Sequence, residues 1–177
     1  KISDDLFFAL PKDVIEKFCK LYKESNLRLP LNISGVHPSV LKEDKFKLLI
    51  DAGMRYVRMG IQSGSQNIRI LYSRNETNEK IMESVNIIHK YKRNLKSINY
   101  DFIVDNPWET VEDIKDSLRL LVQFPKPYSL NIFSLTLYPG TDLYDKACGE
   151  GAINNEDSQI YNKHYHDSVR NSYYNSL

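Results

Sequence analysis

The residues best suited to chemistry in this chain are polar side chains on short, strand-like runs. Gln62 ends one run and offers two donors and an acceptor, which suit a ribose or an amide, although a bond to the neighbouring loop is the alternative. Arg74 lies between two predicted helices, where its guanidinium could clamp a carboxylate or face solvent. Asp101 lies in the middle of a run and could accept hydrogen bonds from ribose hydroxyls or pair with Arg58.

Acidic residues also stand at the ends of predicted strands. Asp4 and Asp5 close the first run, where either could hold an ammonium group or a metal ion, or serve as a turn acid. Asp105 follows Asp101 on the same face, at a strand end. Glu109 begins the next helix, where an acid suits the helix dipole, so helix capping explains it without any function.

Cysteine and histidine spacing predicts no metal site. Cys19 and Cys148 do not form a metal-ligand pattern, and Cys19 is expected to be a buried thiol in an amphipathic helix. His164 and His166 are interpreted as part of a polar tail. The sequence contains no Ser/His/Asp order, P-loop or zinc pattern, and its cysteine usage favours a reducing, cytoplasmic location.

Four strand-like runs, in which polar and apolar residues alternate, must position these side chains. Side chains alternate faces along a strand, so polar residues gather on one face and apolar residues on the other. The runs are 31–34, 56–62, 99–105 and 131–135. Parallel sheets are normally apolar on both faces, so a polar face predicts water or a ligand against it.

Helical periodicity between these runs predicts an α/β fold. The predicted helices cover 11–25, 40–52, 66–72, 77–92, 110–124 and 141–149, and the predicted strands cover 29–34, 55–62, 97–104 and 128–137. Units of about 30 residues favour a partial (β/α) barrel with parallel strands and catalytic groups at their C-terminal ends. A doubly wound open sheet is the alternative, but Gly60 to Gly64 does not match its G-x-G-x-x-G turn.

Composition fits one globular domain followed by an extension. Of the 177 residues, 41% are hydrophobic and 27% charged, and the net charge is +1. This balance indicates no nucleic-acid or membrane-surface partner, and no apolar run is long enough to span a bilayer. We expect the barrel to cover residues 1–151 and a polar extension or tail to cover 152–177.

An ordered set of motifs resembles the radical SAM superfamily. The resemblance covers residues 1 to about 151 and is nearest to radical SAM proteins with a cobalamin-binding domain, and to their coproporphyrinogen oxidase and Elongator-type relatives. The matching segments are 60–65 (GIQSGS), 71–74 (LYSR) with Thr77, 101–110 (DFIVDNPWET), 137–141 (LYPGT), and Asp4-Asp5-Leu6-Phe7 with Phe18-Cys19.

This resemblance implies a partial (β/α)6 barrel, from the end of its second strand through its sixth. It implies S-adenosylmethionine (SAM) bound beside a [4Fe-4S] cluster, and reductive cleavage of SAM to methionine and a 5′-deoxyadenosyl radical, or a cobalamin-linked methyl transfer. By position, the implied cofactor-binding residues are Gln62 and Asp101 for the ribose, Arg74 for the methionine carboxylate, Asp4 or Asp5 for its amino group, Ser34 beside the cofactor, and Ile103 and Tyr138 near the adenine.

The sequence departs from the family pattern in two places. The three-cysteine loop that binds the cluster is absent, and the sequence does not begin with Met, so we expect a fragment of an iron–sulfur oxidoreductase that is inactive alone. Residues 105–110 replace the Pro-Gly-Glu-Thr that is common in the family. An electron donor such as flavodoxin or ferredoxin, an unknown small-molecule or peptide substrate, and cobalamin on a separate domain are the implied partners.

Two further interpretations remain open. The chain could be a non-catalytic module that binds SAM or a nucleoside without redox chemistry. It could also be a barrel lyase or isomerase that uses an acid–base pair, but no lysine or histidine stands at a predicted strand end. No catalytic residue is assigned from the sequence.

Overall fold

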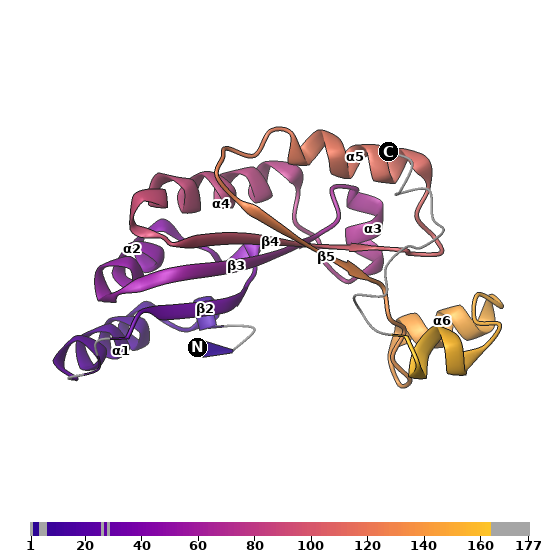
Figure 1. Ribbon diagram of the computed structural model, residues 1–177, viewed down its shortest axis with the longest axis horizontal. Helices are drawn as coiled ribbons and strands as arrows, with labels where there is room; N and C mark the ends of the chain where they lie inside the picture. The colour runs from indigo at the N-terminus through magenta and orange to yellow at the C-terminus, as the bar shows by residue number, and fades with distance from the viewer. Residues whose placement is uncertain (1, 4–6, 26, 28, 164–177) are drawn as a thin grey trace. The chain divides into compact units, whose positions relative to one another are not determined.

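The computed structural model describes residues 2–3, 7–25, 27 and 29–163. Its strands are β1 (Ile2–Ser3), β2 (Leu31–Val36), β3 (Met54–Gln62), β4 (Ser97–Val104) and β5 (Ser129–Ser134), and they form one sheet in that order (Figure 1). β1 has only two residues and pairs in parallel with β2; the four longer strands form a parallel sheet. The predicted α/β class and partial-barrel strand order are therefore confirmed.

Among the described residues, six α-helices lie between and after these strands, with two of them between β3 and β4. They are α1 (Lys12–Glu24), α2 (Glu43–Ala52), α3 (Gln66–Leu71), α4 (Asn78–Lys90), α5 (Val111–Leu121) and α6 (Asp142–Gly149). Short turns of other helix types are η1 (Phe7–Ala9), η2 (Pro38–Val40), η3 (Lys92–Asn94) and η4 (Asp157–Tyr161), the last a π-helical turn. The described helices thus occupy all six predicted segments.

Several predicted boundaries differ from those in the structure, and two of the differences have a local reason. The helix predicted from residue 40 begins at Glu43, because His37 caps the separate turn η2 through a bond from Ser39 N to its Nδ1 at 3.3 Å. The strand predicted to residue 137 ends at Ser134. Its neighbour β4 ends at Val104, whose carbonyl accepts a bond from Leu135 N at 2.8 Å, so β5 has no strand to pair with further on.

The described chain forms two compact units. The first unit comprises Lys1–Ile61, Glu76–Asp101 and Leu120–Asn131; the second comprises Gln62–Asn75, Phe102–Arg119 and Ile132–Leu177.

Burial in the first unit follows the predicted alternation. Along β2 and β3, Ile33, Val57 and Met59 are fully buried, whereas their neighbours Asn32 and Arg58 are only half-buried. The helices α1 and α4 both pack against α2. Their apolar faces, with the apolar face of the strands, make the core of this unit.

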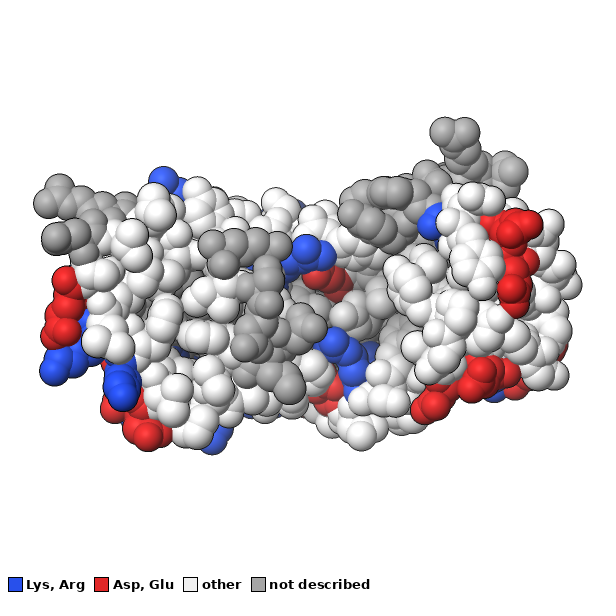
Figure 2. Space-filling view, turned by 90° about the horizontal axis from the view of Figure 1, so that it is seen from below, with Lys and Arg blue, Asp and Glu red and all other residues white. Residues whose placement is uncertain are grey.

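The second unit contains α3, α5, α6 and the C-terminal ends of β3, β4 and β5. A loop after β4 is tied to the end of α6, because Trp108 Nε1 donates to Glu150 Oε2 at 2.5 Å and Lys146 Nζ lies 5.3 Å from the Trp108 ring centroid. On the face shown in Figure 2, the charged side chains of the part that carries α6 are mainly acidic. Among the described residues, no helix is both long and apolar enough to cross a bilayer.

The described part of the extension, residues 152–163, packs within the second unit. Ile160 in η4 is buried, and Lys163 Nζ donates to the carbonyl of Leu135 at 2.6 Å. Burial lowers the pKa of Lys163. The domain boundary at residue 151 stays a prediction, and His164 and His166 lie outside the described residues.

Candidate functional site

A pocket of about 440 Å³ lies in the second unit, at the C-terminal ends of its strands. Apolar side chains form much of its lining, which also carries a few polar groups. The lining residues are Gln62, Leu71, Tyr72, Ser73, Arg74, Ile103, Thr136, Leu137, Tyr138, Thr141, Asp142 and Leu143. Pockets of this size and character are typical of small-molecule and cofactor sites.

Four residues predicted from the sequence line this one pocket. Gln62 is the last residue of β3, Arg74 follows α3, Ile103 lies near the end of β4, and Tyr138 follows β5. The fold therefore brings together side chains from four separate segments of the sequence. Their binding roles stay predictions.

Gln62 stands at the entrance to a strained turn. Its φ of 71° places a non-glycine residue in the left-handed region, which costs free energy unless the surroundings enforce it. The next residues, Ser63 and Ser65, are 1% and 2% exposed. A buried turn therefore fixes where the backbone of Gln62 lies, directly beside the pocket.

Hydrogen bonds also fix the backbone of the segment that follows α3. Arg74 N donates to the carbonyl of Arg69 at 2.8 Å, and Ser73 adopts a φ of 58°. Tyr72 lines the pocket, and its hydroxyl accepts a bond from Asn106 Nδ2 at 2.8 Å. Burial raises the pKa of Tyr72, so its hydroxyl stays neutral.

The opposite wall is the turn between β5 and α6. Thr141 Oγ1 caps α6 by accepting from Tyr144 N at 3.3 Å and also donates to the carbonyl of Tyr138 at 2.8 Å. Gly140 between them has a φ of 85°, which suits glycine. Thr136 Oγ1 is buried and has no hydrogen-bond partner within the described part of the chain, so it can bond to a molecule in the pocket.

Asp101 and Ser34 lie in the first unit, each with a partner of its own. Arg58 Nε donates to the two Asp101 carboxylate oxygens at 2.8 and 2.6 Å, and Asn131 Nδ2 donates to Oδ1 at 2.8 Å. The Arg58–Asp101 pair, the alternative to ribose binding, is thus formed. Two N–H donors, from Arg58 and Asn131, thus bind the carboxylate, and a ribose role for Asp101 stays a prediction. Ser34 Oγ donates to the carbonyl of Ile2 at 3.3 Å.

A perturbed acid lies in the loop and helix that follow β4. Burial, with Asp113 and Asp105 nearby, raises the pKa of Glu109 to about 7. Asp105 has a φ of 60° and accepts a bond from Ser134 Oγ at 2.7 Å. Sequence reasoning explained Glu109 by helix capping alone and missed its burial, because only the fold brings the other carboxylates close.

Sequence reasoning also missed Tyr72, Asn106, Thr136 and Thr141 as parts of this pocket or its frame. The signal for three of them was present, since Tyr72, Asn106 and Thr141 belong to the motif segments 71–74, 101–110 and 137–141. Thr136 lies two residues after Ser134, the last residue of β5, and belongs to none of the motif segments, so no sequence signal marked it.

Metal-binding groups are absent from the described part of the chain. No three His, Cys, Asp or Glu residues come close enough there to hold an ion. Cys19 is buried in α1 as predicted, and burial raises the pKa of its thiol, whereas Cys148 is exposed. Asp4 and Asp5 lie outside the described residues, so their predicted roles stay predictions.

Comparison with known proteins decides the family. The family model described as "Radical SAM superfamily" matches residues 7–121, which is more than half of the chain. The chain belongs to the radical SAM superfamily. This finding confirms the resemblance noted in the sequence, and the pocket lies on strands of that superfamily's barrel.

Individual relatives agree with the family assignment. The tRNA-2-methylthio-N(6)-dimethylallyladenosine synthase of Histophilus somni is 29% identical over 129 residues, covering 67% of this chain and 27% of that protein. Coproporphyrinogen III oxidase (HemN) of Escherichia coli aligns with a TM-score of 0.62 at 25% identity, covering 73% of this chain and 30% of that chain.

A cobalamin-containing structure shares the fold. TsrM from Kitasatospora setae, a radical SAM methyltransferase solved with cobalamin and a [4Fe-4S] cluster, aligns with a TM-score of 0.67 at 18% identity, covering 85% of this chain and 30% of that chain. At this identity the likeness concerns the fold alone. The present chain spans less than a third of the length of each of these three proteins.

Proposed function

We propose that this chain is the SAM-binding part of a radical SAM enzyme, and that the pocket of the second unit holds the cofactor. The supporting observation is that Gln62, Arg74, Ile103 and Tyr138, chosen from the sequence, line one pocket in a chain of this superfamily. Within the pocket, Arg74 would hold the methionine carboxylate and Gln62 a ribose hydroxyl. The binding roles implied for Asp101 and Ser34, which belong to the first unit, and for Asp4 or Asp5 stay predictions.

The residues present fit SAM in size and in chemistry. A volume of about 440 Å³ lies within the usual range for cofactor sites. The apolar side chains Leu71, Ile103, Leu137 and Leu143 offer contact area for a base, and Thr136 Oγ1 is a buried hydroxyl in need of a partner. A guanidinium at Arg74 matches a carboxylate because it can form two parallel, charge-assisted bonds.

The residues present do not fit a [4Fe-4S] cluster. Such clusters are held by cysteine thiolates, and this chain has only Cys19, which is buried in a helix, and Cys148, which is exposed. One-electron reduction of SAM is the chemistry that a bound cluster supplies. We therefore expect this chain to bind SAM but not to cleave it, and we place the cluster ligands elsewhere in the full-length protein.

The test uses the full-length protein, with its cluster reconstituted under anaerobic conditions. We expect it to bind SAM by equilibrium dialysis and to form 5′-deoxyadenosine and methionine when reduced with dithionite or with flavodoxin. A full-length protein with no cysteine triad, or one that fails to bind SAM, would overturn the proposal. A cobalamin-linked methyl transfer is the alternative use of SAM in this proposal.

A non-catalytic SAM-binding module is the second candidate, favoured by the presence of only two cysteines. The same experiment separates the two. SAM binding without a cluster in the full-length protein would support the module, whereas 5′-deoxyadenosine formation would exclude it. The enzyme proposal includes an electron donor such as flavodoxin or ferredoxin, and the cysteine usage is the ground on which we propose a cytoplasmic location.

A further inference from the structure

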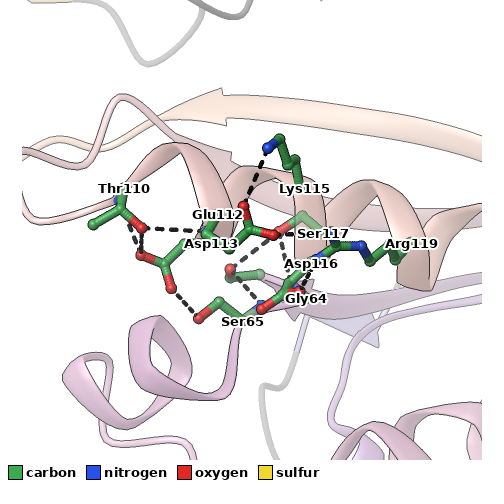
Figure 3. Close-up of polar contacts among 10 residues, drawn as sticks. Gly64, Ser65, Thr110, Glu112, Asp113, Lys115, Asp116, Ser117 and Arg119 are labelled. Carbon is green, nitrogen blue, oxygen red and sulfur yellow. Dashed lines mark hydrogen bonds and ion pairs between the residues drawn. The ribbon is translucent and has the colours of Figure 1, made fainter.

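The turn that joins β3 to α3 lies directly on the backbone of α5 (Figure 3). A Cβ atom at Gly64 would lie 2.3 Å from Ser117 Cα and 2.6 Å from the carbonyl oxygen of Asp116. These separations are far below any real carbon contact, so only glycine fits there. The flanking residues Ser63 and Ser65 are buried as well.

Two side chains of α5 bind this turn. Ser117 Oγ accepts a bond from Gly64 N at 2.8 Å and lies 3.2 Å from Ser63 Oγ. Asp113 Oδ1 accepts a bond from Ser65 Oγ at 2.5 Å (Figure 3). Each residue of the turn is thus bonded to α5 through its backbone or its side chain.

Asp113 is itself held in place by the start of its own helix. Its Oδ2 accepts bonds from Thr110 N at 2.9 Å and Thr110 Oγ1 at 2.6 Å, while its backbone N donates to Thr110 Oγ1 at 3.3 Å. This is a reciprocal capping box with Asp in the place of the usual Glu. Burial alone would raise the pKa of Asp113, but the bonds from Ser65 and Thr110 outweigh it and hold the pKa below its usual value.

The turn in turn holds two polar residues of the pocket, Gln62 and Arg74, through the contacts on either side of it. Gln62 precedes it directly and needs support for its φ of 71°. On the other side, the carbonyl of Ser63 accepts a bond from Arg69 Nη1 at 2.8 Å, and the carbonyl of Arg69 accepts a bond from Arg74 N at 2.8 Å. Contacts therefore run without a break from α5 to Arg74.

We propose that Ser117 and Asp113 are positioning residues, which hold the Ser63–Gly64–Ser65 turn and thereby set Gln62 and Arg74 in place around the pocket. Neither residue lines the pocket, so neither touches the ligand. The proposal rests on the proposed function for the identity of that ligand. It assigns a role to α5 that follows from contacts made across more than fifty residues of sequence, as with Gly64 and Ser117.

The first test measures binding of S-adenosylhomocysteine to the full-length protein by calorimetry, well below the unfolding midpoint of every variant. We expect Ser117→Ala to weaken binding about tenfold, or about 1.4 kcal/mol, because the buried N–H of Gly64 loses its hydrogen-bond partner. Asp113→Asn serves as a second variant in case Ser117→Ala does not fold. Lys115→Ala is the control, since Lys115 lies on the same helix and bonds there to Glu112, an exposed residue away from the turn.

A double-mutant cycle separates positioning from a general loss of stability. If Ser117 acts through Arg74, Ser117→Ala should weaken binding much less in an Arg74→Ala background than in the wild type. A merely structural role predicts equal losses in both backgrounds, and that result would overturn the proposal. Unchanged binding in both Ser117→Ala and Asp113→Asn would overturn it as well.

A second readout needs no ligand and separates failure of this proposal from failure of the proposed function. In hydrogen–deuterium exchange of the unliganded protein, Ser117→Ala should speed exchange across residues 62–74 but not across Leu31–Ala52 of the first unit. If the wild type binds no S-adenosylhomocysteine, the proposed function fails, and the exchange result still decides whether α5 holds the turn. Unchanged exchange at 62–74 would reject the positioning role.

Discussion

Replacement of Gly64 by alanine is the sharpest test of the contact between the turn and α5. The added Cβ would lie 2.3 Å from Ser117 Cα, whereas carbon atoms in contact prefer about 3.5–4.0 Å. The two backbones would have to separate by roughly 1.2 Å or more. The nearest atoms, Ser117 Cα and the Asp116 carbonyl oxygen, belong to the backbone of α5, so no flexible side chain can move aside to relieve the clash.

The expected loss follows from two contributions. Overpacking of a closely packed contact costs about 1–3 kcal/mol. Separation of the backbones also weakens the 2.8 Å bond from Gly64 N to Ser117 Oγ, at about 1 kcal/mol. We therefore expect Gly64→Ala to lower the free energy of local unfolding of α5 by about 2–4 kcal/mol.

Native-state hydrogen exchange of the α5 amides, followed in increasing urea, measures this local free energy directly. Gly149→Ala is the matched control, because Gly149 ends α6 in the same unit and nothing lies within 4 Å of a Cβ built there. That control should leave stability unchanged or raise it by up to about 1 kcal/mol. Wild-type exchange in Gly64→Ala, or equal losses in both glycine variants, would refute the reasoning.

Three further predictions concern charged groups. Arg74→Ala should weaken SAM binding to the full-length protein by about 1.5–3 kcal/mol, roughly 10- to 150-fold in Kd, as measured by equilibrium dialysis; Arg93→Ala, at an exposed arginine of η3, should not, and equal affinity of wild type and Arg74→Ala would contradict the assignment. Because Glu109, with its raised pKa of about 7, keeps a proton that the unfolded chain releases near pH 4.5, stability should fall as pH rises between these values; Glu109→Gln should flatten this part of a urea-unfolding profile, and an unchanged slope would show that Glu109 is not its source. Asp101→Ala should lower the unfolding free energy by about 1.5–3 kcal/mol by removing the carboxylate that Arg58 binds, and Asp101→Ala with Arg58→Met should recover part of that loss in urea unfolding; a double variant no better than the single one would speak against loss of this ion pair as the cause.

Local sequence patterns predicted the strands and helices well because each pattern depends on residues near one another. The alternation that buries Ile33, Val57 and Met59 and half-exposes Asn32 and Arg58 is a period of two, which needs no knowledge of the fold. Boundaries were wrong where a distant or specific contact decides them. β5 ends where its neighbour β4 ends, and the sequence near Ser134 has no local signal that predicts this end.

The candidate site was predictable only in part, for a similar reason. Gln62, Arg74, Ile103 and Tyr138 were found because motifs mark them, and the fold places all four around one pocket. For Asp101, residue type alone left ribose binding and pairing with Arg58 as alternatives. The structure forms the pair, and the ribose role of Asp101 stays a prediction.

The role of Asp113 illustrates why supporting residues escape sequence reasoning. Thr110 and Asp113 are recognisable as a local capping box, and that local function is sufficient to explain an acid at this position. A carboxylate has two oxygens, however, and the cap uses mainly Oδ2. The other oxygen accepts the bond from Ser65, so the residue that starts α5 also fixes the turn beside Gln62. A capping residue with a second carboxylate oxygen can thus connect a local sequence signal to a distant site. The segment GIQSGS supplies the matching residues, because only Gly64 lets α5 come close enough for Ser65 to reach that oxygen.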